Sequence, residues 1–335
     1  MAVTEDGEAV GSLSGGCVEA AVHELAQQVL ADGVPRRGHY GITDDDAFAI
    51  GLTCGGTLEV LVAIPDTGLL ADLLGRAQNG EPCALATVVS GPAEVGRQLV
   101  AGESTAGSLG VTGLDVAVTA DAAGMLAAGQ TGVRHYGSRG QRRIDDVAVL
   151  VQSLTPPPRM LVFGATDFAG ALTQVGALLG YHVTLCDARP VFATARRFPH
   201  THEVVCAWPD RYLAGEVTGG RVDARTVVAV LTHDPKFDVP LLVTALGSDA
   251  GYIGAMGSRR THDGRLASLR AAGVDELALA RLRSPIGLDL GGRTAQETAV
   301  SIAAELVQVR WGGTGRPLSR LEGPVHWSVP DHVLM

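Results

Sequence analysis

The spacing of apolar residues along the chain changes repeatedly, and each change predicts a different element. Between residues 18 and 30, apolar side chains recur at three- and four-residue spacing, which predicts an amphipathic helix. Residues 58–64 form an apolar, β-branched run that is typical of a buried strand. From residue 159 to residue 310, apolar strands alternate with helical stretches. This alternation predicts a parallel sheet, so we expect an α/β protein.

The N-terminal part of the chain contains an internal repeat. Residues 4–13 resemble residues 101–109, and the segments that follow also align, with Leu114 opposite Cys17. We therefore expect one fold element to occur twice and the thiol to occur once. The strand predicted over residues 83–89 precedes only the second copy. The first copy is expected to begin late, to lack a strand and to leave an exposed sheet edge, which favours self-association as a homodimer.

A glycine-rich loop stands directly before the first predicted helix. It reads Gly-Ser-Leu-Ser-Gly-Gly-Cys and contains Ser14, Gly15, Gly16 and Cys17. Glycines expose backbone N–H groups, and a helix N-terminus attracts anions, so the loop predicts an anion site. The same field would lower the pKa of the Cys17 thiol. The alternative is a tight turn followed by a small buried cysteine.

A second cysteine lies in a second glycine loop, this time before a strand. Cys54, Gly55 and Gly56 precede the apolar run at 58–64. If the two loops converge, they present two thiols, Cys17 and Cys54, and several backbone donors to one ligand. The alternative is two unrelated turns. The acidic run at 44–46 is interpreted as a solvated turn, and no metal site is predicted.

The second half of the chain begins with a predicted βαβ unit. Gly164, Thr166 and Ala169 stand at the three glycine positions of a dinucleotide-binding turn, and Asp187 follows about 20 residues later, where an acid binds the ribose. The fold is indicated clearly, and NAD(P) is the cofactor that it suggests. Thr166 is expected to obstruct the pyrophosphate, and Asp187 has a helix cap as its alternative role.

A further anion site is predicted where a later helix begins. Ser258, Arg259 and Arg260 follow a glycine after a short apolar strand. Arginine in the first turn of a helix opposes the helix dipole, so an anionic ligand would explain its position. The alternative is an exposed basic helix start.

Three consecutive prolines, at residues 156–158, mark the predicted domain boundary. The expected organisation is a duplicated N-terminal α/β domain over residues 1–153, a Rossmann-like doubly wound parallel sheet over residues 159–311 and an irregular tail over residues 312–335. The chain length of 335 residues agrees with about two domains.

Composition and charge exclude several classes of function. The net charge is −10 and no basic patch is present, which argues against a nucleic-acid partner. No apolar run is long enough to span a membrane, and the acidic N-terminus does not resemble a signal peptide. The five cysteines are scattered, which favours a cytoplasmic protein with reduced thiols.

Four motifs, in order, resemble the XdhC/CoxI family. They are Gly-Ser-Leu-Ser-Gly-Gly-Cys-Val-Glu at 11–19, Cys-Gly-Gly-Thr-Leu-Glu-Val at 54–60, Tyr-Ile-Gly-Ala-Met-Gly-Ser-Arg-Arg-Thr at 252–261 and Ser-Pro-Ile-Gly-Leu-Asp-Leu-Gly-Gly-Arg-Thr at 284–294. Members of this family are accessory proteins of molybdenum hydroxylases such as xanthine dehydrogenase and carbon monoxide dehydrogenase. The resemblance implies a duplicated N-terminal domain and a C-terminal Rossmann domain.

The resemblance also implies a function. The chain would bind molybdenum cofactor (molybdopterin), assist its sulfuration and insert it into an apo molybdenum hydroxylase, with a cysteine desulfurase as a further partner. Cys17 and its loop would be the functional element, supported by Cys54. On this interpretation the protein is a maturation chaperone rather than an enzyme.

Two other classes of function stay open. An NAD(P)-dependent oxidoreductase would use the βαβ unit, Asp187 and an acid/base pair for which His233 and Asp234 are the candidates. A structural interaction module would leave the Rossmann domain empty. The chain is too short for the iron–sulfur, flavin and molybdopterin domains of a complete xanthine dehydrogenase, and no four-cysteine cluster pattern is present.

Overall fold

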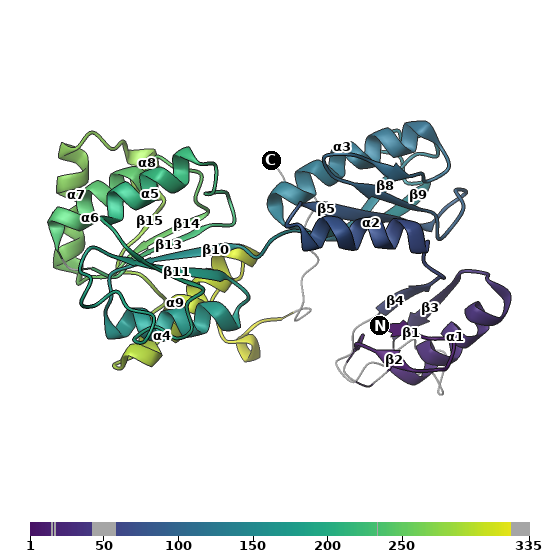
Figure 1. Cartoon of the computed structure of the whole chain (residues 1–335), viewed down its shortest axis with the longest axis horizontal. Helices are drawn as coiled ribbons and strands as arrows, with labels where there is room; N and C mark the ends of the chain where they lie inside the picture. The colour runs from purple at the N-terminus through teal and green to yellow at the C-terminus, as the bar shows by residue number, and fades with distance from the viewer. Residues whose placement is uncertain (15, 17, 42–57, 233, 323–335) are drawn as a thin grey trace. The chain divides into compact units, whose positions relative to one another are not determined.

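A computed structural model describes residues 1–14, 16, 18–41, 58–232 and 234–322. The chain forms two compact units, Met1–Pro156 and Pro157–Met335 (Figure 1). Both units combine helices with sheets, so the predicted α/β class is confirmed.

The first half of the N-terminal unit contains one helical layer and two separate two-stranded antiparallel sheets in its described residues. Its elements are β1 (Ala2–Val3), β2 (Ala9–Val10), α1 (Glu19–Asp32), β3 (Arg36–Tyr40) and β4 (Leu58–Val62). Val18 and Val22 are buried and pack against Tyr40 and alternate residues of β4. The predicted helix and the predicted strand at 58–64 are therefore both present.

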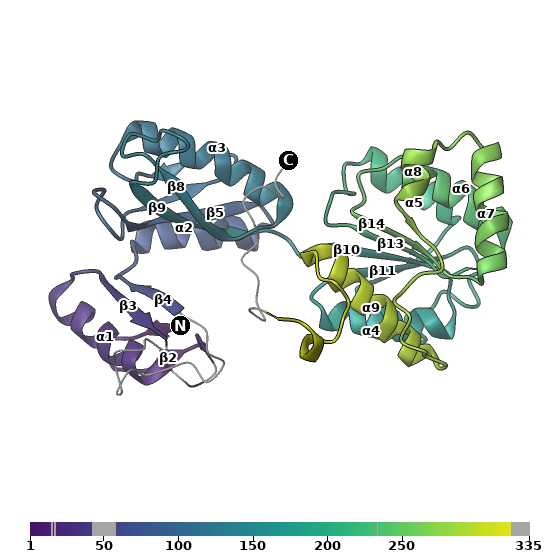
Figure 2. The ribbon, with the colours of Figure 1, turned by 180° about the vertical axis from the view of Figure 1, so that it is seen from behind.

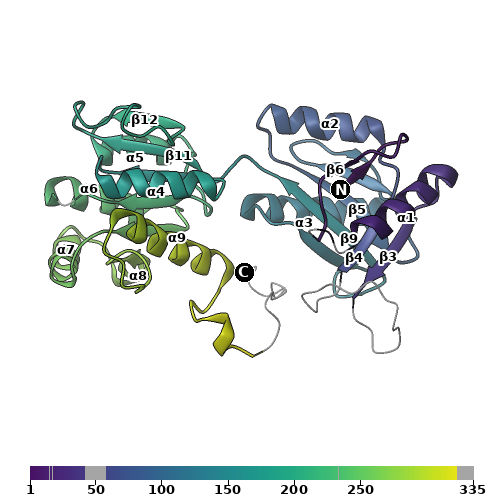
Figure 3. The ribbon, with the colours of Figure 1, turned by 90° about the horizontal axis from the view of Figure 1, so that it is seen from below.

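The second half of this unit is a five-stranded antiparallel sheet in the order β7-β6-β5-β9-β8. Its elements are α2 (Thr67–Gln78), β5 (Cys83–Ser90), β6 (Gln98–Ala101), β7 (Ala106–Gly107), α3 (Thr112–Ala128), β8 (Gly132–Tyr136) and β9 (Val147–Leu154). Alternate residues of β5 face opposite sides, as strand geometry requires. Ala84 and Ala86 pack with α3, whereas Cys83 and Leu85 pack with α2, so the two helices cover opposite faces (Figure 3).

The internal repeat is visible in matching hydrogen bonds. Ser12 Oγ donates to the carboxylate of Glu19, seven residues later, and Ser108 Oγ donates to the carboxylate of Asp115 at the same spacing. Each carboxylate also accepts from the amide six residues before it. Glu19 and Asp115 are therefore equivalent positions at the start of α1 and α3.

This equivalence corrects the sequence alignment by one residue. Leu114 matches Val18 rather than Cys17, and both Leu114 and Val18 are fully buried at the base of their helices. Position 17 matches Gly113, where an added Cβ would lie 2.3 Å from the carbonyl oxygen of Arg139. The alignment of residue types placed the glycines opposite each other, whereas burial and the capping carboxylates set the actual register. The second copy still lacks a thiol.

The two copies differ in one strand. In the second copy, β5 lies between β6 and β9 and pairs antiparallel with both. Among the described residues of the first copy, no strand lies between β1 and β4, and the two hairpins form separate sheets. Each of these strands therefore presents one edge without a described partner.

The C-terminal unit is built on a six-stranded parallel sheet in the order β12-β11-β10-β13-β14-β15. The strands are β10 (Arg159–Phe163), β11 (His182–Asp187), β12 (Glu203–Cys206), β13 (Val227–Val230), β14 (Tyr252–Ala255) and β15 (Leu282–Arg283). The helices are α4 (Asp167–Leu178), α5 (Pro209–Thr218), α6 (Pro235–Leu246), α7 (Arg259–Ala271), α8 (Glu276–Ala280) and α9 (Ala295–Trp311), followed by the 3-10 turn η1 (Leu318–Arg320). The order of the strands reverses between β10 and β13, which confirms the predicted doubly wound sheet.

Helices cover both faces of this sheet (Figures 1 and 2). Met160 and Val162 of β10 pack with α4 and α9, and the alternating residues Leu161 and Phe163 pack with α5, α6, α7 and α8. Because both faces are buried, the central strands are apolar without interruption, and this produced the continuous apolar runs in the sequence.

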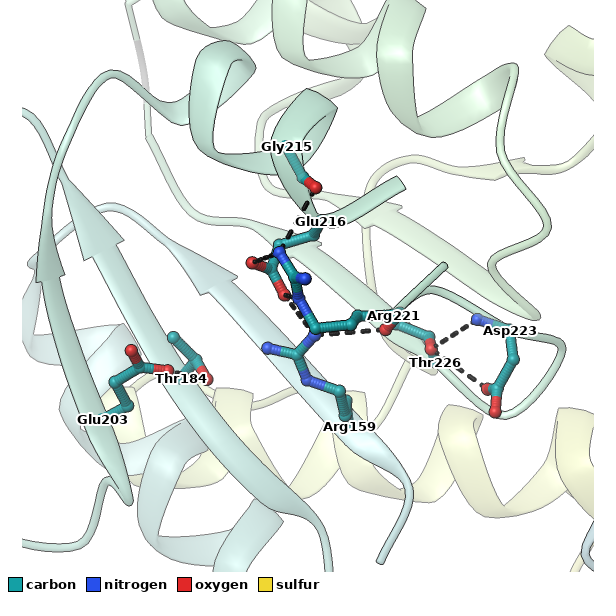
Figure 4. A network of polar contacts seen from close by, with 8 residues as sticks. All are labelled: Arg159, Thr184, Glu203, Gly215, Glu216, Arg221, Asp223 and Thr226. Carbon is teal, nitrogen blue, oxygen red and sulfur yellow. Dashed lines mark hydrogen bonds and ion pairs between the residues drawn. The ribbon is translucent and has the colours of Figure 1, made fainter. Parts of the chain in front are cut away.

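Ion pairs close the amino end of the central strand (Figure 4). Arg159 donates to the carboxylate of Glu216 and, at 3.1 Å, to the carbonyl oxygen of Arg221. The Arg221 guanidinium also donates to Glu216, at 2.9 Å, and this contact is the main cause that lowers the pKa of Glu216. These partners are all within the protein, so the network stabilises the fold, and the opposite, carboxyl edge is the one with loops that can receive a ligand.

Candidate functional site

Several predicted site residues lie outside the described residues of the structure. These are Gly15, Cys17, Cys54, Gly55 and Gly56. The flanks of the first loop are described, and they show how the backbone on either side of position 17 is held.

The carboxylate of Glu19 gathers the backbone amides of the first glycine loop. Its Oε1 atom accepts from the N–H groups of Leu13 at 3.1 Å and Ser14 at 2.9 Å. Its Oε2 atom accepts from the N–H groups of Gly16 at 2.9 Å and Val18 at 3.1 Å. The hydroxyl of Ser14 donates to Oε2 as well, at 3.0 Å. The described residues of the loop are therefore held by a side chain of the helix that they precede.

This arrangement supplies the anion that the glycine loop was expected to bind. Hydrogen bonds, chiefly from Ser12 and then from Ser14, hold the pKa of Glu19 well below its usual range. A carboxylate surrounded by backbone N–H groups at a helix start is a stable anion site. An external phosphate would have to displace Glu19 to reach the amides of Ser14 and Gly16. The sequence expectation of an open anion site at these two residues is not supported by this geometry.

In the C-terminal unit, the turn between β10 and α4 is built as the βαβ motif predicts. Gly164 has a φ of +106°, and a Cβ there would lie 2.7 Å from Thr232 Cγ2 and 3.0 Å from the Thr232 nitrogen. Only glycine fits where the turn passes so close to the end of β13. Thr166 is the N-cap of α4, and its hydroxyl accepts from the Ala169 N–H at 3.2 Å. The threonine thus has a structural role at the position where a glycine was expected.

The carboxylate of Asp187, at the end of β11, has all its acceptor sites occupied by hydrogen bonds from its own chain. Its carboxylate accepts from the Ala165 N–H at 2.7 Å, and from the backbone N–H and two guanidinium nitrogens of Arg189 at 2.8 to 2.9 Å. Burial alone would raise the pKa of Asp187, but these bonds outweigh it and the pKa is lowered. Four bonds fill the acceptor sites of a carboxylate, so none is left for a ribose hydroxyl.

The predicted anion site at the start of α7 lies on the same carboxyl edge of the sheet. Ser258 caps the helix by accepting from the Thr261 N–H at 3.1 Å. Arg259 and Arg260 occupy the first turn and are exposed, and neither has an ion-pair partner within the described part of the chain. The geometry brings the ends of β10, β11 and β14 to one edge, while the glycine loop of the N-terminal unit belongs to a different compact unit.

Of the candidate acid/base pair His233 and Asp234, only Asp234 lies within the described residues. His233 lies outside the described residues. Asp234 caps α6: its carboxylate accepts from the Lys236 N–H at 3.1 Å and lies 3.1 Å from the Lys236 ammonium. These contacts with Lys236 lower the pKa of Asp234. Asp234 therefore acts as a helix cap.

Sequence reasoning missed a buried ion pair that holds the carboxyl edge together. Arg265 of α7 donates to Asp238 of α6 at 3.1 Å, and both side chains are almost completely buried. Arg265 also donates to the Met256 carbonyl at 2.8 Å and to the Ser284 hydroxyl at 2.9 Å. Thr232 donates to the other oxygen of Asp238. The signal was available: Arg265 precedes the buried Leu269 by one helical turn, and so shares its inward face.

The described residues contain neither a candidate membrane-spanning helix nor a candidate metal site. No helix in those ranges is long and apolar enough to cross a membrane. No group of three or more His, Cys, Asp or Glu side chains there is placed to hold a metal ion. Cys17, Cys54 and the acidic run at 44–46 fall outside those ranges.

Comparisons with known proteins connect these two units to one family. The XdhC and CoxI family matches residues 1–41 and 76–137, and the XdhC Rossmann domain matches residues 160–306. A crystal structure described as a xanthine dehydrogenase from Bacillus halodurans superimposes with a TM-score of 0.67 at 22% identity, covering 99% of this chain and 89% of that one. At this identity the likeness shows a shared fold.

Two curated relatives are also similar in sequence. The molybdenum cofactor insertion chaperone PaoD of Escherichia coli is 26% identical over 317 residues, which cover 92% of this chain and 77% of PaoD. A Bacillus subtilis protein, named as a probable xanthine dehydrogenase subunit, is 28% identical over 162 residues, which cover 48% of this chain and 46% of that protein. With family matches in both units and in the same order, the chain belongs to the XdhC and CoxI family.

Proposed function

We propose that this protein binds molybdenum cofactor and passes it to an apo molybdenum hydroxylase of the xanthine or carbon monoxide dehydrogenase type. The cofactor is cargo rather than a resident group. The proposal is supported by family membership and by the names of two relatives, an insertion chaperone for molybdenum cofactor and a probable xanthine dehydrogenase subunit.

The observation that carries the proposal is the difference between the two copies of the repeat. Both copies use a carboxylate, Glu19 or Asp115, to fix the loop before a helix. Only the first copy has a cysteine in that loop, and the second has Gly113, where a side chain does not fit. A scaffold that works without the thiol indicates that Cys17 serves chemistry rather than folding.

The chemistry that suits this position is sulfur chemistry. The N–H groups of Gly16 and Val18, on either side of position 17, both donate to one oxygen of Glu19, so the residues that flank Cys17 are both bonded to the start of α1. A thiolate is a good ligand for a soft metal centre. We propose that Cys17 contacts the metal of the cofactor while the cofactor is held and sulfurated, with a cysteine desulfurase as the sulfur source.

The experiment measures retention of molybdenum by the full-length chain. The wild type, Cys17→Ser and Cys206→Ser are each mixed with cofactor freshly released from a molybdenum hydroxylase, and then passed over a desalting column. Cys206 is the matched control because it is an exposed thiol in the C-terminal unit. We expect molybdenum to co-elute with the wild type and with Cys206→Ser, and to be largely lost from Cys17→Ser. Equal retention by all three proteins would reject the role of Cys17.

A second measurement separates binding from delivery. Each protein, loaded with cofactor, is added to an apo xanthine dehydrogenase, and the recovered activity is followed with time. The proposed function requires faster recovery with the wild type than with free cofactor at the same concentration. A chain that retains molybdenum but gives no faster recovery would be a storage protein and not a delivery factor.

A further inference from the structure

Aromatic rings paired with cations gather on the carboxyl edge of the parallel sheet, and Phe192 and Trp208 among them are exposed. Among the described residues, every cation–π contact except that of Arg310 with Trp311 lies in the segments that follow β11, β12 and β13. The contacts are Arg189 over Phe192 at 4.6 Å, Arg197 over Phe192 and Phe198 at 5.5 and 5.4 Å, Arg211 over Trp208 at 5.9 Å, and Lys236 over Phe237 at 4.7 Å. We call these residues the cationic aromatic rim.

The centre of the rim is a pair of rings from two different helix starts. The centroids of Trp208 and Phe237 lie 5.1 Å apart, with 51° between their planes. Trp208 is the N-cap of α5, and Phe237 is in the first turn of α6. Both helices begin with a proline, and the helices pack against each other in one core. The aromatic surface is therefore preorganised by rigid elements.

Packing alone does not explain the exposure of Trp208. The side chain is 48% exposed, although tryptophan is usually well buried and the chain is only 4% aromatic. Leaving a large ring in water costs hydrophobic free energy, which a bound ring would recover. Parallel α/β sheets place their ligands at this edge, next to the point where the order of the strands reverses.

Two cations, Arg211 and Lys236, stand over the ring pair in a chain whose net charge is −10. Arg211 stands over Trp208, is exposed and has no ion-pair partner among the residues that the structure describes. Lys236 stands over Phe237, with the Asp234 carboxylate 3.1 Å from its ammonium. An uncompensated guanidinium beside an exposed ring favours a ligand that has both a flat ring and an anionic group.

We propose that Trp208 and Phe237 form a stacking site for a planar heteroaromatic ring that carries phosphate, with Arg211 binding the phosphate. Adenine nucleotides and phosphorylated pterins share this chemistry. The site lies in the C-terminal unit and does not depend on Cys17. With an adenine nucleotide it goes beyond the proposed function, and with a phosphorylated pterin it rests on that function and adds a second contact for the same cargo. It also differs from a ribose contact at Asp187, whose acceptors are filled.

The test is a calorimetric titration of the full-length chain with two groups of probes. The first group is NAD⁺, NADP⁺ and AMP, with adenosine as the form without phosphate. The second group is neopterin triphosphate, with neopterin as the form without phosphate. Binding in only one group identifies the source of the ring. If no probe of either group binds, the proposal is overturned.

Variants then locate the site. Trp208→Leu is expected to weaken binding by about 5- to 150-fold, because stacking on an aromatic side chain contributes about 1–3 kcal/mol per base. Trp311→Leu is the matched control, since Trp311 is 61% exposed and has the Arg310 guanidinium 5.0 Å from its ring, but ends α9. Equal affinities in these two variants would overturn the proposal.

Two more variants keep the test decisive if Trp208→Leu does not fold. Trp208→Tyr retains a flat ring and is expected to bind nearly as well as the wild type. Arg211→Gln leaves both rings in place, and we expect it to weaken the phosphorylated probe while leaving adenosine or neopterin unchanged. If Arg211→Gln weakens the phosphorylated and unphosphorylated forms equally, the proposed contact between Arg211 and the phosphate is wrong. Since no probe contains molybdenum, these results are independent of the retention assay at Cys17.

Discussion

Glu19 and Asp115 hold the same position in two copies of one repeat, but in the described residues Glu19 accepts more hydrogen bonds from the preceding loop than Asp115 does. Asp115 accepts from a serine hydroxyl and one amide, at 2.7 Å each. Glu19 accepts from two serine hydroxyls and from amides on both sides of position 17. Among the residues that the structure describes, the added contacts occur only in the copy that carries the cysteine.

We predict that Glu19→Gln reduces molybdenum retention several-fold while Asp115→Asn does not. The glutamine side chain has one acceptor oxygen where the carboxylate has two, and it loses the charge that strengthens each bond. The amides on both sides of position 17 would then be held less tightly. Retention is measured as for Cys17→Ser, with circular dichroism to show that α1 and α3 persist. If Asp115→Asn causes the same loss, the effect is general destabilisation.

We also predict that the Glu19 carboxylate raises the pH at which Cys17 reacts. A neighbouring anion disfavours the thiolate and so raises the pKa of the thiol, against the helix field that lowers it. Removing the charge in Glu19→Gln should therefore lower the pKa of Cys17, and alkylation by iodoacetamide should begin at a lower pH than in the wild type. Mass spectrometry of the peptide that contains Cys17, measured across a pH series, gives the two midpoints. An unchanged or higher midpoint in the variant would contradict the prediction.

Breaking the buried ion pair between Arg265 and Asp238 should lower the free energy of unfolding of the C-terminal unit. Arg265→Met leaves Asp238 buried without its charged partner, which typically costs about 3–5 kcal/mol of unfolding free energy. The exposed pair of Arg270 and Glu276 is the matched control, and Glu276→Gln is expected to change stability little. Urea unfolding followed by circular dichroism measures both. A small effect of Arg265→Met would mean that water reaches Asp238.

Asp187 should make the stability of the C-terminal unit depend on acidity. Its pKa is lowered in the folded state, so its stabilising contribution is present above the unfolded-state pKa, about 3.9, and is lost as the pH falls through the folded pKa. Asp187→Asn should cost about 1–3 kcal/mol at neutral pH, through lost hydrogen bonds to Ala165 and Arg189. The difference between wild type and variant should shrink below pH 4. A difference that is constant with pH would show that the charge contributes nothing.

Much of the fold could be predicted from residue patterns, since burial of both sheet faces leaves long apolar runs such as Met160 to Phe163. The βαβ turn was also predictable, because only glycine fits at position 164. The hydrogen bonds between polar side chains and loops could not be predicted from the sequence. Glu19 was counted as one residue of a motif, although it reaches back over seven positions to Ser12. The sequence leaves Asp187 as a ribose contact or a helix cap, and nothing in the sequence indicates that Arg189 and Ala165 fill its acceptor sites.

The carbonyl of Arg139 has a consequence for how this repeat can evolve. It occupies the space that any side chain at Gly113 would need. A cysteine at position 113 would therefore clash with this carbonyl unless the turn that contains Arg139 also changed. The backbone of a neighbouring turn thus excludes a thiol from the second copy at the position where the first copy carries one.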